Sequence, residues 1–107
     1  PTNKVAYVDG SFDVLHVGHI RIIQKAQEMA DFVIVGIHDD DLINEHKGDG
    51  YPVLTLQERV LNILSLKYCD EVIIGAPWRV TANMIKNLNI QMVLEVTNPN
   101  LLSTRGY

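Results

Sequence analysis

The feature that most constrains the fold is an apolar run, FVIVGI, at Phe32–Ile37. It is apolar almost throughout and rich in β-branched residues, which is typical of a strand covered on both faces of a parallel sheet. Other strand-like runs lie at residues 5–8, 71–74 and 91–96. Apolar residues recur at helical spacing at residues 19–29, from Thr55 onward and at about 81–88. The alternation predicts an α/β fold: a Rossmann-like, doubly wound parallel sheet with right-handed crossovers.

Two segments between these elements carry local signals. Residues 39–50 are polar and are predicted to be a loop, with the acidic run at 39–41 suited to a helix start. Residues 55–58, with the sequence TLQE, predict a capping box. The helix that follows is expected to bury the apolar side chains of Leu56, Val60, Ile63 and Leu64.

Composition limits the class of protein. The 107 residues are enough for one domain and too few for two. A net charge of −4 argues against a general nucleic-acid surface, because binding to phosphate backbones needs a cationic field. The lone Cys69 cannot form an internal disulfide, which fits a reducing compartment, and we expect a cytoplasmic domain. No apolar stretch approaches the roughly 20 residues that a membrane-spanning helix needs.

The loop after the first strand carries the clearest chemical signal. It lacks the G-x-G-x-x-G fingerprint and instead contains HVGH at residues 16–19, at the expected start of the first helix. A helix N-terminus favours anions, Gly18 lets a phosphate approach the backbone, and His16 and His19 lie on one side of the first turn. The alternatives are a surface pair or a metal pair. Zinc would need further ligands from Cys69, His38 and His46, and their spacing fits no zinc pattern.

Four segments in the same order resemble the cytidylyltransferase family, the HxGH nucleotidyltransferases. They are YVDGSFDVLHVGH at residues 7–19, HKG at 46–48, ER at 58–59 and YCDEVIIGAPW at 68–78. The match covers residues 4 to about 94. Some family members act on phosphoethanolamine and have two such domains, and the match is strongest to the second of these domains. The resemblance implies that the sheet is of the nucleotidyltransferase type.

The resemblance also implies a reaction. A cytidylyl group would pass from CTP to phosphoethanolamine, giving CDP-ethanolamine and pyrophosphate, with Mg2+ carried on the CTP. Two alternatives stay open. The chain could be a non-catalytic nucleotide-binding half of a two-domain enzyme, or a related nucleotidyltransferase that uses another phospho-alcohol or ATP.

The family pattern assigns roles to particular residues. The implied catalytic residues are His16, His19 and Lys47, with Lys47 on the loop after the second strand. CTP binding is implied for these residues and for Ser11, Phe12, Gly18, Arg59, Ser103 and Thr104. Asp9 and Trp78 are implied to bind the phospho-amine, and no protein residue is assigned to a metal.

Several of these residues have a plainer alternative. Asp9 could be a turn aspartate, Arg59 could form a surface ion pair, and Trp78 could pack under a loop. Asp13, which has no assigned role, either orients its loop or caps a helix. Cys69 is expected to be a small core residue.

The end of the chain departs from the family pattern. The acidic, glycine-bearing loop expected after the fourth strand does not match residues 94–100, and residues 101–107 resemble only a remnant of the last family signature. We therefore expect a single domain at residues 1–107 that is a fragment or is incomplete at its C-terminus. Expected partners are a second copy or a second cytidylyltransferase domain, without a membrane span. Peripheral attachment to the endoplasmic reticulum is the alternative location.

Overall fold

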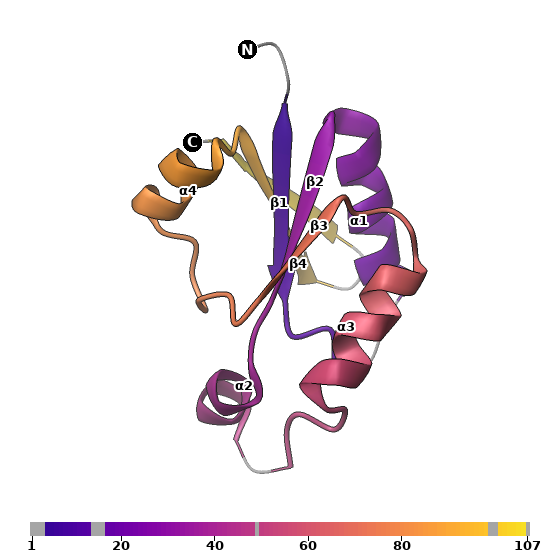
Figure 1. Ribbon diagram of the computed structural model, residues 1–107, viewed down its shortest axis with the longest axis vertical. Coiled ribbons are helices and arrows are strands. Elements are labelled where there is room, and N and C mark those ends of the chain that lie inside the picture. The colour runs from indigo at the N-terminus through magenta and orange to yellow at the C-terminus, as the bar shows by residue number, and fades with distance from the viewer. Residues whose placement is uncertain (1–3, 14–16, 49, 99–100, 107) are drawn as a thin grey trace.

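A five-stranded sheet runs through the molecule (Figure 1). The computed structural model describes residues 4–13, 17–48, 50–98 and 101–106, with side chains as far as residue 94. The strands are β1 (Val5–Gly10), β2 (Phe32–Ile37), β3 (Glu71–Ile74), β4 (Met92–Asn98) and β5 (Leu101–Gly106). Their order is β3-β2-β1-β4-β5, and the four strands β1 to β4 pair in parallel. The predicted α/β fold is confirmed.

The fifth strand was not predicted. β5 pairs antiparallel with β4, so the sheet has one antiparallel edge strand rather than being parallel throughout. Residues 101–106, interpreted above only as a signature remnant, lie in this strand. An edge strand of this kind depends on its partner, and the short sequence LLSTRG has no strong strand pattern of its own.

Within the described residues, the helices between the strands are α1 (Val17–Met29), α2 (Asp40–Lys47), α3 (Leu56–Ser65) and α4 (Ala82–Leu88). The prediction of a loop at residues 39–50 is therefore wrong for most of its length. Asp39 caps α2, its carboxylate accepting from the Leu42 N–H at 2.9 Å, so the predicted helix start is confirmed. Only Ile43 of α2 is buried, which explains why apolar periodicity did not reveal the helix.

Helices cover both faces of the sheet. In Figure 1, α1 and α3 lie on one side and α4 on the other. The α1 and α3 side holds the larger core cluster, which includes Val8, Ile23 and Ile63. The α4 side is built around Tyr7, which lies against Gly36: a Cβ at Gly36 would stand 2.0 Å from the Tyr7 hydroxyl. That close approach requires glycine in the middle of β2.

The start of α3 is as predicted. The Thr55 hydroxyl accepts from the Glu58 N–H, and the Glu58 carboxylate accepts from the Thr55 N–H, which completes the capping box. Hydrogen bonds to the Glu58 carboxylate, first from the Thr55 backbone N–H and then from the Thr55 side chain, hold the pKa of Glu58 below its usual value. The prediction that Leu64 is buried is wrong: it is 51% exposed, because it lies on the outer side of the helix. Among the described residues, no helix is both long and apolar enough to cross a membrane.

Candidate functional site

A cavity of about 300 Å3 opens at the carboxyl end of β1. The chain reverses its order across the sheet at this strand, since β2 lies on one side and β4 on the other. Ligands of open α/β sheets bind at such a switch point. The cavity is lined by Val8, Asp9, Gly10, Ser11, Phe12, His19, Ile22, His38, Lys47 and Trp78.

The turn after β1 forms one wall. Phe12 adopts a left-handed backbone conformation with φ of 52°, which is uncommon for a bulky residue and turns the chain sharply from β1 towards α1. Its buried ring meets the His19 imidazole edge-on, with centroids 5.5 Å apart. A Cβ at Gly10 would lie 3.2 Å from the same ring, so glycine gives Phe12 its room. The turn thereby sets the orientation of His19.

The first turn of α1 carries the central motif. Gly18 is buried at the start of the helix, and His19 follows it on the cavity wall. The N–H groups of a first helical turn favour an anion in this position. His16, the other histidine of the motif, lies outside the described residues, so its predicted role stays a prediction.

Lys47 reaches the cavity from the opposite side. It was predicted to lie on a loop, whereas it is the last residue of α2. It also lines an adjoining cavity of about 240 Å3, together with His19 and Tyr51. The Asn44 side chain donates to the Gly48 and Tyr51 carbonyls at 3.2 Å each, which holds the chain just after Lys47.

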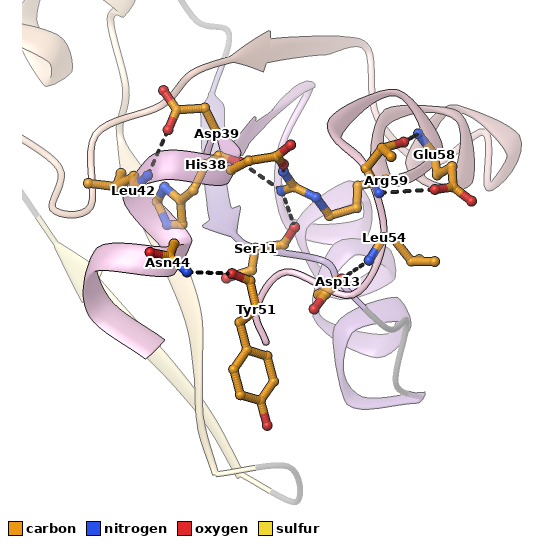
Figure 2. Close-up of polar contacts among 12 residues, drawn as sticks. Ser11, Asp13, His38, Asp39, Leu42, Asn44, Tyr51, Leu54, Glu58 and Arg59 are labelled. Atoms are coloured by element: carbon orange, nitrogen blue, oxygen red, sulfur yellow. Dashed lines mark hydrogen bonds and ion pairs between the residues drawn. The ribbon is translucent and has the colours of Figure 1, made fainter. Parts of the chain in front are cut away.

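Asp13 orients a loop. Its buried carboxylate accepts from the backbone N–H of Val53 at 2.7 Å and of Leu54 at 2.6 Å, the second of which is drawn in Figure 2. This contact joins the turn after β1 to the segment before α3. Of the two interpretations of Asp13, the loop-orienting one is confirmed.

Arg59 lies inside the protein rather than on its surface. Its side chain is fully buried and pairs with Asp40, so the alternative of an ion pair is confirmed, while the expected surface position of Arg59 is wrong. One terminal nitrogen donates to the Ser11 carbonyl at 2.8 Å and to the His38 carbonyl at 2.6 Å (Figure 2). The other terminal nitrogen donates to the Asp40 carboxylate at 2.5 Å. The guanidinium thus ties together the ends of β1 and β2 and the start of α2. Contact with CTP stays a prediction, and Arg59 is absent from the cavity wall.

Trp78 and His38 form the remaining wall. Trp78 is half-buried and lines the cavity, so it does more than pack under a loop. Its ring stacks on His46, with centroids 3.9 Å apart and planes 9° apart, and it lies 5.0 Å from the ring of His38. His38 lines the cavity beside Trp78, whereas His46 contacts the indole without lining the cavity, and neither contact was predicted.

His38 is the site residue that sequence reasoning missed. It follows β2 directly and is 4% exposed, and its Nδ1 lies 3.0 Å from the Ala76 carbonyl oxygen. Burial lowers the pKa of His38, an effect that the positive charges of Arg59 and Lys47 strengthen and the Ala76 carbonyl and Asp39 oppose. Its position after the last apolar residue of a buried strand was the available signal, because such positions face the switch point.

The remaining predicted residues are placed as follows. Asp9 lies at the end of β1 on the cavity wall. Ser103 and Thr104 lie in β5, their backbones paired with Glu95 and Leu94, and their side chains lie outside the described part. Cys69 packs against the larger core, as expected. Among the described residues, no three His, Cys, Asp or Glu side chains cluster in a way that could hold a metal ion.

A sheet of this order, with a polar cavity at its switch point, defines a doubly wound α/β domain with a ligand-binding crevice. Residues 7–102 match the cytidylyltransferase-like family, and the chain belongs to that family. It is 44% identical over 106 residues to the ethanolamine-phosphate cytidylyltransferase of Dictyostelium discoideum, covering 99% of the chain and 29% of that relative. The corresponding protein of Arabidopsis thaliana is 42% identical over 97 residues, covering 91% and 23%. The chain thus spans less than a third of the length of these relatives.

A solved structure has the same fold. The lipopolysaccharide core biosynthesis protein from Thermoplasma volcanium superposes with a TM-score of 0.71 over 85% of this chain and 72% of that one. The two sequences are 21% identical, so the likeness concerns the fold alone.

Proposed function

We propose that this chain is a domain of an ethanolamine-phosphate cytidylyltransferase and binds CTP and phosphoethanolamine in the cavity at the end of β1. The observation that carries the proposal is the meeting of His19, the first turn of α1 and Lys47 at one cavity that Asp9 and Trp78 also line. His19, the first turn of α1 and Lys47 suit phosphates, whereas Asp9 and Trp78 suit an ammonium group. The resemblance to ethanolamine-phosphate cytidylyltransferases over nearly the whole chain supports the same substrates.

The proposed reaction is a direct displacement. An oxygen of the phosphoethanolamine phosphate forms a bond to the α-phosphorus of CTP. The bond from that phosphorus to the oxygen bridging to the β-phosphorus breaks, and its electron pair leaves with pyrophosphate. Such a transfer depends on positioning and on stabilising developing charge, and it needs no covalent nucleophile from the protein.

In this proposal the chain's own residues have distinct tasks. His19 and His16 donate hydrogen bonds to the phosphates as their charge grows, and Lys47 neutralises that charge from the other side. The backbone of Ser11, Phe12 and Gly18 lets the nucleotide approach closely. Asp9 and Trp78 attract the substrate ammonium, one by charge and the other by its ring.

Mg2+ belongs to the nucleotide in this proposal. Mg2+ would enter as the CTP complex, held mainly by phosphate oxygens and water. We also propose pairing with a second copy or a second cytidylyltransferase domain.

The test is turnover of the protein with Mg-CTP and phosphoethanolamine, followed by phosphorus NMR of CDP-ethanolamine. Lys47→Met is expected to lower kcat/KM by about a hundredfold or more, because one preorganised charge is lost. Lys86→Met, which changes an exposed lysine on α4, is the matched control and should leave kcat/KM unchanged.

Two outcomes would contradict the proposal. Formation of an adenylyl product with ATP in place of CTP would favour the related nucleotidyltransferase class, to which the similar FAD synthase of Thermococcus sibiricus points by its name. The chain could also bind CTP without turnover, while Lys47→Met leaves kcat/KM of the intact protein unchanged. That result would favour a non-catalytic half of a two-domain enzyme.

A further inference from the structure

We propose that His38 determines specificity by accepting a hydrogen bond from a substrate N–H, so that the cavity prefers an amine that keeps at least one N–H over a quaternary one. The inference rests on the proposed function and concerns the same cavity. His38 belongs to none of the motifs that the sequence analysis assigned to substrate.

The tautomer of His38 follows from its contact. Nδ1 lies 3.0 Å from the Ala76 carbonyl oxygen, and a carbonyl oxygen can only accept a hydrogen bond. Nδ1 therefore carries a proton. In the neutral ring, Nε2 then has a lone pair and acts as an acceptor.

The surroundings keep the ring in place. The His38 N–H donates to the Gly10 carbonyl at 3.1 Å, and the His38 carbonyl accepts from Arg59 at 2.6 Å. Ala76 is itself fixed, since its N–H donates to the Ile37 carbonyl at 3.0 Å. Within the described part of the chain, no hydrogen bond joins Nε2 to another residue. A buried, neutral imidazole on the cavity wall thus keeps one acceptor available.

The charged groups around His38 favour its neutral form. Lys47 and Arg59 lower its pKa in addition to burial, while Asp39 and the Ala76 carbonyl act in the opposite direction. Trp78 contacts both imidazoles: its ring lies 5.0 Å from that of His38, and the ring of His46 stacks on the indole.

The neutral ring differs from the other two candidate contacts of the ammonium. The carboxylate of Asp9 and the indole of Trp78 attract a cation whether or not it is methylated. Only the hydrogen bond to Nε2 requires an N–H on the substrate. A quaternary amine would leave that buried acceptor unpaired, which is the costly case in molecular recognition.

The test is kcat/KM with CTP for phosphoethanolamine and its N-methyl, N,N-dimethyl and N,N,N-trimethyl derivatives. The first three ammonium ions keep at least one N–H, so the loss should come mainly at the last methylation, by about 10- to 100-fold. A gradual loss with each methyl group would mean selection by size and would overturn the proposal.

Variants separate the acceptor from a structural effect. His38→Leu should remove the drop in kcat/KM at the last methylation, and its loss of kcat/KM for phosphoethanolamine should appear mostly in KM. His38→Gln keeps an acceptor oxygen and should retain part of the drop. His46→Leu removes the imidazole that touches Trp78 without lining the cavity, and the drop should stay at the last methylation. The Kd for CTP reports whether each variant keeps its fold.

The two proposals fail differently. An equal loss for all four substrates in His38→Leu would overturn the role of His38 and leave the proposed function standing. A wild-type protein that turns over none of the four amines with CTP would overturn the proposed function, and the role of His38 with it.

Discussion

The two walls of the cavity are built in different ways. The wall of Ser11, Phe12 and His19 comes from one continuous segment, the turn after β1 and the first turns of α1. The opposite wall takes His38 from the end of β2, Lys47 from the end of α2 and Trp78 from the segment after β3. The first wall is local in sequence, and the second is assembled from distant segments.

The difference shows where each wall gets its rigidity. The first wall follows from a strand, a sharp turn and a helix start that are neighbours in the sequence. The second wall depends on contacts between distant segments. Arg59 binds backbone carbonyls at the ends of β1 and β2, and Asp13 binds the backbone of residues 53 and 54. His46 stacks on Trp78. Substitution of the residues that make these contacts should therefore disturb the assembled wall while leaving α1 in place.

The largest effect is expected for Arg59→Met. It leaves the carbonyls of Ser11 and His38 without their donor and Asp40 without its partner, so the free energy of unfolding should fall by about 3 kcal/mol or more. Denaturant unfolding measures this. Arg21→Met changes an exposed arginine on α1, and its free energy of unfolding should stay within about 0.5 kcal/mol of the wild-type value. Equal losses in the two variants would mean that Arg59 does not join the strand ends.

A smaller effect is expected for Asp13→Asn. An amide of the same shape has a single acceptor oxygen for the N–H groups of Val53 and Leu54, so stability should fall by about 1 to 3 kcal/mol. Hydrogen exchange at these two amides should also become faster. Asp41→Asn, on the exposed start of α2, is the matched control. Unchanged exchange at Val53 and Leu54 would contradict the Asp13 contact.

The smallest effect is a pH dependence of stability through His38. Its pKa is lowered in the folded protein, first by burial, so as pH falls below about 6.5 the unfolded chain takes up a proton that the folded protein refuses. Stability should therefore fall with pH in that window, by no more than about 1.4 kcal/mol per pH unit. His38→Gln should show a shallower slope, measured by denaturant unfolding at a series of pH values. An unchanged slope would contradict the lowered pKa of His38.

Much of the fold was predictable because its signals are local. The apolar run at Phe32–Ile37, the capping box at Thr55 and the spacing along α1 each depend on neighbouring residues. The missed elements lack such signals: α2 buries only Ile43, and β5 exists through its pairing with β4. Within the site, the motif wall was predictable, whereas His38 and the buried position of Arg59 were not.

The sequence by itself determined the family, the parallel sheet and the motif segment at residues 7–19, because periodicity and contiguous motifs carry that information. Only the tertiary structure decided that His38 lines the cavity with its Nδ1 on the Ala76 carbonyl, that the His38 carbonyl meets the buried Arg59 and that Trp78 contacts two imidazoles. These properties depend on burial and on contacts between segments 20 to 50 residues apart, such as the 21-residue and 48-residue separations that Arg59 bridges. A linear pattern does not encode which distant carbonyl meets which side chain, since that is set by how the elements pack.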